Sequence, residues 1–183
     1  MTSDTDRAAL LRIARAAISA RVLRADAPAL DVTGTLGRRA GAFVTLRNHG
    51  DLRGCIGRVE ATAALSRVVA ECALAAATED SRFPPVTPSE VHDLEIEISV
   101  LGPLEALTTL DDFDVGRHGL VVSAGWQRGL LLPQVAVERR WDRETFLAQT
   151  CHKAGLPRDA WKHGADVWRF EAEVFSDNKG GRG

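Results

Sequence analysis

The segment Leu52-Arg53-Gly54-Cys55-Ile56-Gly57 brings together residue types that can do chemistry. Side chains of a β-strand alternate between two faces, so Arg53, Cys55 and Gly57 are expected to share one face. A guanidinium near a thiol favours the thiolate, which is the reactive form of cysteine. The glycines Gly54 and Gly57 let a ligand or another backbone approach closely. We therefore interpret this strand as part of a site in which Cys55 acts as a nucleophile or thiol ligand.

Both reactive side chains also have structural explanations. Free cysteine is among the most buried residue types, so a core position explains Cys55 as well. Arg53 carries the rigid fork that binds carboxylate or phosphate, which favours an anion-binding role. Its alternatives are a solvated charge on an edge strand, or an ion pair with Glu79 or Asp80.

Three further polar residues lie where a loop or a strand end can aim them at a site. His118 precedes Gly119 and an apolar run, and it is either a base or a structural cap. Arg82 projects from a segment made stiff by prolines, where either a functional or a packing role is typical. Gln134 follows residues 130–133, which we interpret as a buried strand, and its amide can hydrogen-bond a ligand. We predict that these three residues meet Arg53 and Cys55 in one cleft. Catalytic roles are predicted for Cys55 and His118. Ligand-binding roles are predicted for Arg53, Gly54, Gly57, Arg82 and Gln134.

Other candidates have simpler explanations. Cys72 and Cys151 fall on the apolar faces of expected helices, which favours core packing. The three cysteines are widely spaced and match neither a disulfide framework nor a C-x-x-C pair. Glu95 and Glu97 share the outward face of a strand and are typical of a solvated surface. No metal site and no cofactor is assigned.

Composition excludes several classes of protein. A net charge of −2, without a stripe of Lys and Arg, argues against a nucleic-acid-binding surface. The longest apolar run, residues 73–77, is far too short to cross a bilayer. Residues 1–12 are polar and lack the apolar core of a secretion signal, so we expect a cytoplasmic protein.

The hydrophobic pattern predicts an α+β protein with a mainly antiparallel sheet. Ser3 and Asp6 resemble a capping box for a helix over residues 4–23. Strict alternation over residues 94–101 indicates a half-buried strand. A three-residue turn, His49-Gly50-Asp51, is expected between strands 42–48 and 52–59. Further helices are expected over residues 62–79 and 142–154. Further strands are expected over residues 120–123, 130–132 and 166–175. Residues 25–40 are expected to form a loop with at most a short strand around residues 30–32. Residues 4–176 are taken as one domain and 177–183 as a disordered tail.

Several segments resemble the AMMECR domain family in their order along the chain. They are residues 52–57, 80–85, 94–101, 118–120, 128–135 and 151–156. The resemblance covers about residues 8–175. It implies a two-lobed fold with residues 52–57 near the cleft between a larger and a smaller lobe. In bacteria and archaea such proteins are called protein A of the AmmeMemoRadiSam set, whose genes accompany a Memo-like protein and a radical-SAM protein, and the family implies no particular reaction.

Two functions remain open on this basis. One is an enzyme whose Cys55 thiol attacks a small anionic molecule that Arg53 and Arg82 bind in the inter-lobe cleft, with His118 as base. The other is a non-catalytic binding or protein-interaction module that acts with the Memo-like and radical-SAM partners. A reactive, accessible Cys55 would indicate the first. An exposed apolar patch, for which Trp126 in a turn is the candidate, would indicate an interaction protein.

Overall fold

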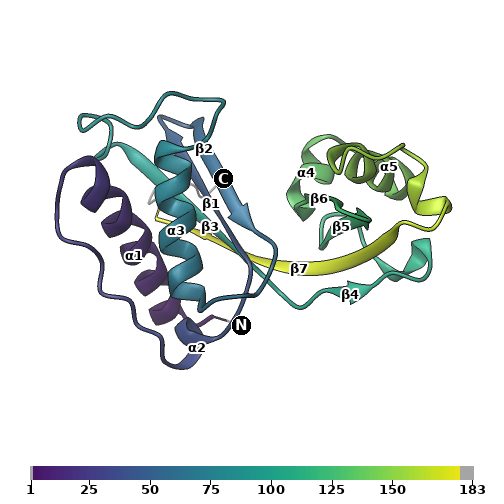
Figure 1. Cartoon of the computed structure of the whole chain (residues 1–183), viewed down its shortest axis with the longest axis horizontal. Coiled ribbons are helices and arrows are strands. Elements are labelled where there is room, and N and C mark those ends of the chain that lie inside the picture. Colours follow the sequence, from purple (N-terminus) through teal and green to yellow (C-terminus); the bar gives the residue numbers. More distant parts are fainter. Residues whose placement is uncertain (1, 178–183) are drawn as a thin grey trace. The chain divides into compact units, whose positions relative to one another are not determined.

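The computed structural model describes residues 2–177, which fall into two compact units. Among these residues the first unit comprises 2–100 and 173–177, and the second comprises 101–172. Strand β7 (Asp166–Ser176) contributes residues to both units. Helices and antiparallel strands in both units confirm the predicted α+β class (Figure 1).

The first unit is a sheet with two helices packed on one face. Its elements are α1 (Asp4–Val22), α2 (Gly34–Gly37), β1 (Ala42–Asn48), β2 (Asp51–Arg58), α3 (Leu65–Thr78), β3 (Leu94–Leu101) and the end of β7. Helix α3 packs against β1 and β2, and α1 packs against α3, as Figure 1 shows. The apolar face of each helix joins the inward side chains of β1 and β3 in one core.

The start of α1 follows the predicted capping box. The Ser3 hydroxyl accepts from the Asp6 backbone N–H at 3.1 Å, and the Asp6 carboxylate accepts from the Ser3 backbone N–H at 2.9 Å. These bonds satisfy two of the donors that a helix leaves unpaired at its N-terminus. The predicted start at residue 4 is therefore confirmed.

Strand β1 lies between β2 and β3 and is antiparallel to both. The turn before β2 is shorter than predicted, because Asp51 pairs with Asn48 and leaves only two loop residues. Those residues, His49 and Gly50, both have positive φ, at 51° and 87°. Two positive φ angles are what a two-residue hairpin turn requires to match the twist of its strands. The register then shifts by one residue between Leu46 and Arg47, which leaves Arg53 without a partner on β1 and places Thr45 opposite Cys55.

The second unit has its own antiparallel sheet, in the order β4-β7-β5-β6. Its elements are β4 (Glu105–Ala106), the 3-10 turn η1 (Leu110–Asp112), β5 (His118–Ala124), β6 (Gln127–Leu131), α4 (Pro133–Glu138), α5 (Arg143–Lys153), the 3-10 turn η2 (Ala160–Lys162) and the start of β7. Helices α4 and α5 pack on this sheet. Leu120 and Val122 of β5 meet Phe146 and Leu147 of α5 in its core.

Several short elements differ from the sequence prediction. Residues 25–40 contain the helix α2 and no strand around residues 30–32. Gln134 does not end a strand, because Pro133 begins α4 at its first helical position. The predicted tail starts one residue too early, since Asp177 accepts from the Ile96 backbone N–H at 2.8 Å. Residues 178–183 of that prediction lie outside the described residues.

No helix within residues 2–177 combines the length and the apolar character needed to cross a bilayer.

Candidate functional site

The segment Leu52–Gly57 forms most of β2, and its two faces have different surroundings. Gly54 faces α3, where an added Cβ would lie 2.1 Å from the carbonyl oxygen of Ala76. Gly57 faces the other side of the sheet, where an added Cβ would lie 2.2 Å from the ring of Phe43. Close packing of a helix backbone and of an aromatic ring therefore accounts for both glycines. Their predicted contact with a ligand stays a prediction.

Cys55 lies on the face of the first sheet that α1 and α3 do not cover. We call this side the helix-free face, and its residues include Phe43, Thr45, Cys55, Gly57, Glu97 and Ser99. The Cys55 thiol is half-buried, and its Sγ accepts a hydrogen bond from the Thr45 hydroxyl at 3.4 Å. A hydroxyl that donates to sulfur stabilises negative charge on it.

The other two cysteines are more buried than Cys55. Cys72 and Cys151 are buried in the cores of the first and second units, as the helical pattern predicts. Burial raises the pKa of Cys72 to about 11, and burial also raises the pKa of Cys151. Of the three cysteines, Cys55 is half-buried, and Cys72 and Cys151 are buried.

Arg53 is bound within the protein by the segment that connects α3 to β3. Its Nε and Nη2 donate to the two carboxylate oxygens of Glu90, at 2.7 and 3.2 Å. Its Nη1 and Nη2 also donate to the carbonyl oxygens of Pro84 and Pro85, at 2.8 and 3.2 Å. The side chain of Arg53 is only 13% exposed. An ion pair was one of the predicted alternatives, but its partner is Glu90 rather than Glu79 or Asp80.

The same contacts stabilise the ionised form of the Glu90 carboxylate. Hydrogen bonds from Arg53 and from the backbone N–H of Thr87 lower the pKa of Glu90 to about 2. The charges of Arg53 and Glu90 therefore cancel within one bidentate pair. Arg53 holds the Pro84–Pro85 segment against β2 and contributes little net positive charge to the helix-free face.

A second pair, Asp80 with Arg82, contacts Cys55 directly. Asp80 is 7% exposed and accepts from the Cys55 backbone N–H at 2.9 Å. Its carboxylate also accepts from Nε and Nη2 of Arg82, at 2.9 and 2.7 Å. Nη2 of Arg82 lies 3.4 Å from the Cys55 carbonyl oxygen, so the pair brackets one peptide unit of β2.

Both members of this pair are charged. Hydrogen bonds from Arg82, together with that from the Cys55 backbone N–H, hold the pKa of Asp80 well below its usual range. The hydrogen bond to Asp80 in turn raises the pKa of Arg82, and the proximity of Cys55 adds to this effect. The Arg82 side chain is 55% exposed, so its guanidinium is both fixed and accessible.

Sequence reasoning missed Thr45 and Glu90 as partners of the candidate residues, and it named Asp80 as a partner of Arg53 rather than of Arg82 and Cys55. Asp80 stands two positions before Arg82, a spacing at which a short carboxylate can bond to the following turn. That local signal was available from the sequence. Thr45 and Glu90 gave no comparable signal, because their contacts depend on the strand register and on the path of a loop.

His118 and Gln134 belong to the second unit and are described within it. The His118 ring is buried, and its Nδ1 accepts from the Asp114 backbone N–H at 2.9 Å. This contact closes the turn before β5, which fits the structural alternative given for His118. Gln134 is half-buried in the first turn of α4. A shared cleft that would join these two residues to Cys55 stays a prediction, as does the role of His118 as base.

Comparisons with known proteins agree with the resemblance noted in the sequence. The AMMECR1 family model matches residues 11–175. A protein of Methanothermobacter thermautotrophicus is 45% identical over 92% of this chain and 93% of its own length. Protein MJ0810 of Methanocaldococcus jannaschii is 45% identical over 76% of this chain and 74% of its own length.

A solved structure shares the fold. The crystal structure of the uncharacterized protein PH0010 from Pyrococcus horikoshii superimposes with a TM-score of 0.83 and 40% sequence identity. The match covers 92% of this chain and 90% of that one. Family match, relatives and fold agree over nearly the whole length, and the chain belongs to the AMMECR1 family.

Proposed function

We propose that this protein binds a small anionic molecule at the helix-free face of the first unit, where Arg82 contacts the anion beside the thiol of Cys55. The observation that carries the proposal is the half-used guanidinium of Arg82. Its Nε–Nη2 edge is held by Asp80, and Nη2 also lies 3.4 Å from the Cys55 carbonyl oxygen. Within residues 2–177 its Nη1 makes no hydrogen bond. An arginine has a second edge of parallel donors, formed by Nη1 and Nη2, that suits a carboxylate or phosphate.

The geometry supports binding more directly than catalysis. Activation of a cysteine nucleophile requires a group that removes the thiol proton. Among the described residues, the hydrogen-bond partner of the Cys55 Sγ is the Thr45 hydroxyl, which donates to the sulfur. Cys55 is therefore proposed as an accessible thiol next to the bound anion, with Thr45 orienting it. Arg53 is not part of the proposed ligand contact, because Glu90 and two carbonyl oxygens occupy its donors.

Alkylation with two reagents of different charge tests this proposal. Iodoacetamide is neutral and iodoacetate is anionic, and both alkylate a thiolate with loss of iodide. We expect Cys55 to react with both reagents in the native protein, while Cys72 and Cys151 react only after unfolding. Peptide mass spectrometry of the labelled cysteines would measure the rates.

Removal of Arg82 separates anion binding from thiol exposure. Arg82→Gln should lower the iodoacetate rate at Cys55 about threefold to tenfold more than the iodoacetamide rate. The charge-balanced variant Asp80→Asn/Arg82→Gln should show the same loss of selectivity, which excludes the unpaired Asp80 carboxylate as its cause. Arg47→Gln, on the same face of β1, is the matched control and should leave the ratio unchanged. Equal effects of Arg82→Gln on both reagents would contradict the proposed anion contact.

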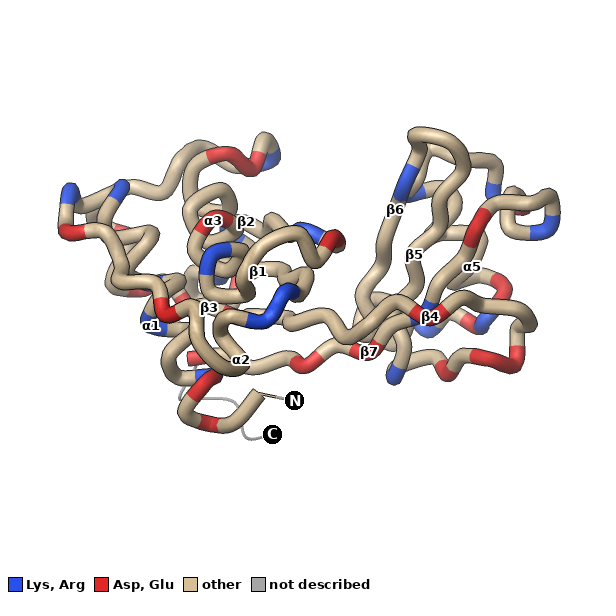
Figure 2. Tube along the Cα trace, turned by 60° about the horizontal axis from the view of Figure 1, so that its bottom comes forward, with Lys and Arg blue, Asp and Glu red and all other residues tan. Residues whose placement is uncertain are grey.

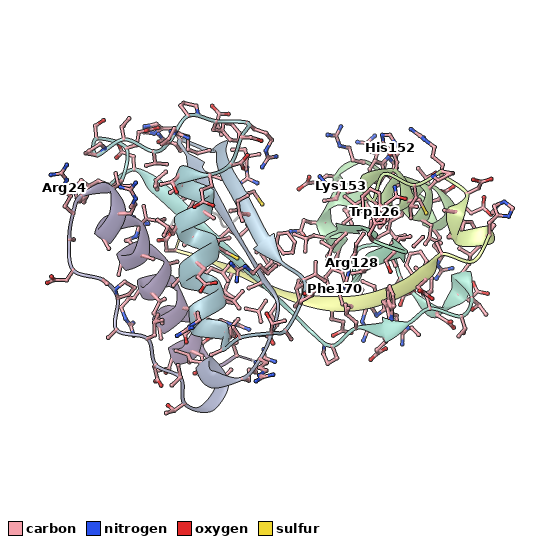
Figure 3. All side chains as sticks on the ribbon, in the orientation of Figure 1. Arg24, Trp126, Arg128, His152, Lys153 and Phe170 are labelled. Carbon is pink, nitrogen blue, oxygen red and sulfur yellow. The ribbon has the colours of Figure 1, made fainter. Side chains whose placement is uncertain are left out.

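A second candidate function, a protein-interaction module, is favoured by one specific observation. Trp126 is 92% exposed at the tip of the β5–β6 hairpin. The hairpin is held in place, since Gln127 donates to the Gly155 carbonyl oxygen at 2.6 Å. Figure 3 shows Trp126 on the same side of the second unit as His152 and Lys153. An exposed tryptophan on a rigid turn is typical of an interaction anchor.

The partners for this second function come from the family resemblance: a Memo-like protein and a radical-SAM protein. Titration calorimetry of the protein with each purified partner would test it. We expect Trp126→Ala to weaken any such binding at least about tenfold, as is usual for a central aromatic anchor. Unchanged affinity in Trp126→Ala would contradict this use of the hairpin.

A further inference from the structure

The strands β2 and β6 stand at the two ends of the strand order, and their outer edges differ. On the outer edge of β2 the Asp80 carboxylate accepts from the Cys55 N–H at 2.9 Å. The ladder of β2 with β1 is also interrupted by the register shift at Arg53. Strand β6, in contrast, pairs with β5 in five consecutive residue pairs without a shift. The protein therefore covers the edge of β2 with a side chain and keeps β6 regular.

The turn between β5 and β6 determines which backbone groups of β6 point outward. Ala124 and Gln127 flank the two-residue loop and pair with each other, so this first pair is hydrogen-bonded. Bonded and non-bonded pairs alternate along an antiparallel ladder, which makes Leu130 and Val121 a non-bonded pair. The N–H and C=O of Leu130 therefore point away from β5. Within residues 2–177 the Leu130 N–H donates to no acceptor outside the sheet.

Strand β6 is held in place by the end of α5. An added Cβ on Gly129 would lie 2.4 Å from the backbone nitrogen of Ala154, so the helix end packs directly on the strand. The Gln127 side chain donates to the Gly155 carbonyl oxygen at 2.6 Å. Because these contacts fix β6 before a partner arrives, little ordering of this strand remains to oppose binding.

The chain around this edge carries positive charge without acidic residues. Residues 124–132 and 150–158 contain three Lys or Arg residues and no Asp or Glu. Arg128 and Lys153 lie on the same side of the second unit as Trp126 in Figure 3. Figure 2 shows a basic position on β6 and no acidic one. An acidic segment therefore complements this edge, whereas pairing of β6 with β6 of a second copy would oppose like charges.

We infer that β6 pairs with an extended, acidic segment of a partner protein, which adds a strand to the second sheet. The backbone of that segment exchanges hydrogen bonds with Leu130, its carboxylates lie near Arg128 and Lys153, and an apolar side chain packs on Trp126. Strand addition takes its affinity from main-chain hydrogen bonds and its specificity from alternate side chains. The inference rests on the protein-interaction function proposed for Trp126 and gives the chemistry of the partner.

Three short synthetic peptides test the inference on the full chain. The first alternates glutamate with valine, and the second has lysine in place of glutamate. The third is the glutamate peptide with every amide N-methylated, which keeps the charge but blocks strand pairing. The glutamate peptide at saturation should slow hydrogen exchange of the Leu130 amide at least about tenfold, because this amide gains an acceptor. The other two peptides should leave it unchanged, and the Val44 amide of the first unit should not respond to any of them.

Variants separate strand pairing from charge, with the remaining amide signals as the check on folding. Leu130→Pro removes the outward N–H and should weaken binding of the glutamate peptide at least about tenfold. Proline is tolerated where the N–H of an edge strand faces solvent, and Leu130→Val, which keeps the N–H, is the matched control. Lys153→Glu should weaken binding about threefold to tenfold. Arg24→Glu makes the same change of charge in the first unit and should keep the affinity.

The outcomes also separate the inference from the function on which it rests. No protection of the Leu130 amide by the glutamate peptide, or equal binding of the N-methylated peptide, would overturn strand pairing and leave the role of Trp126 standing. Binding that is lost in Leu130→Pro but unchanged in Trp126→Ala would support the edge strand and contradict the anchor. Protection that rises with protein concentration alone would assign the edge to a second copy. Equal protection by an oligothymidylate would assign it to a single-stranded nucleic acid, and either result would overturn the acidic segment.

Discussion

Arg53 and Arg82 both bind carboxylates of the segment between α3 and β3, yet the protein uses the two guanidinium groups to different extents. Arg53 donates from all three nitrogens, to Glu90, Pro84 and Pro85, and is 13% exposed. Arg82 donates from Nε and Nη2 and is 55% exposed. Both arginines were predicted to bind an anion. Arg53 instead holds a loop in place, and Arg82 has a donor that remains available for a ligand.

The difference follows from how each arginine meets its carboxylate. Glu90 and the two carbonyl oxygens enclose Arg53, so water and ligands reach few of its donors. Asp80 lies two residues from Arg82 and meets only one edge of its guanidinium. On the other edge Nη2 lies 3.4 Å from the Cys55 carbonyl oxygen, and Nη1 is left to solvent. An ion pair of an arginine thus argues against ligand binding only when the N–H donors of the guanidinium are hydrogen-bonded within the protein and its charge is neutralised.

The largest expected effect is the loss of the enclosed arginine. Arg53→Ala should lower the free energy of unfolding by about 3 kcal/mol, because Glu90 and two carbonyl oxygens lose their partner in a poorly hydrated place. Arg82→Ala should cost only about 1 kcal/mol, since water can replace a half-exposed guanidinium. Urea unfolding followed by circular dichroism measures both. A larger loss in Arg82→Ala than in Arg53→Ala would reverse the comparison.

The ion pair of Arg53 with Glu90 should also make the free energy of unfolding depend on pH in the acid range. The pKa of Glu90 is about 2 in the folded protein and about 4.3 in an unfolded chain, so its contribution is complete above about pH 4.3. The contribution falls as the pH drops from about 4.3 through 2, and it amounts to about 3 kcal/mol. Arg53→Ala should lose this part of the acid dependence, as judged from unfolding free energies at about pH 5 and about pH 3. An unchanged pH slope in Arg53→Ala would show that another carboxylate is responsible.

The elements that the sequence predicts well are those whose signals are local. The alternation over residues 94–101 and the capping box at Ser3 each depend on neighbouring residues only, and β3 and α1 follow them closely. Helix α4 was missed although Pro133 is a good residue for a first helical position, because the apolar run before it resembles a strand. Strand β4 has two residues, which is too short for any period to be visible.

The candidate site could be predicted only in part for the same reason. The pattern of β2 predicts Arg53 and Cys55 on one face, but the register shifts at Arg53, and a face does not determine what a long side chain touches. The guanidinium of Arg53 reaches Glu90, 37 positions away, and the loop that brings Glu90 there has no sequence signal. The contact of Thr45 with Cys55 needs the strand register, which the two-residue turn and a one-residue shift at Arg53 set together.

A smaller effect is expected from Asp80, the carboxylate that connects Arg82 to β2. Strand β2 ends the strand order of its sheet, and the Asp80 carboxylate satisfies the Cys55 N–H on that strand. Asp80→Ala should speed hydrogen exchange of the Cys55 amide about tenfold, because the amide loses its acceptor. The amide of Val44 in the central strand β1 serves as control and should keep its protection. Equal acceleration at both amides would indicate general destabilisation of the sheet.

The smallest change in stability is expected for Arg82→Lys, a change that should nevertheless affect the proposed anion binding. Arg82→Lys keeps the positive charge beside Asp80, so the free energy of unfolding should change by no more than about 0.5 kcal/mol. A lysine has no second edge of parallel donors, however, so the preference of Cys55 for iodoacetate over iodoacetamide should fall toward that of Arg82→Gln. Arg53→Lys is the matched comparison and should show the opposite result. It should lower the free energy of unfolding clearly more than Arg82→Lys, because one ammonium cannot replace the guanidinium donors to Glu90, Pro84 and Pro85. It should leave the preference of Cys55 for iodoacetate unchanged. If Arg82→Lys retained the full preference, charge alone would explain the anion contact, and the free edge of the guanidinium would no longer distinguish Arg82 from Arg53.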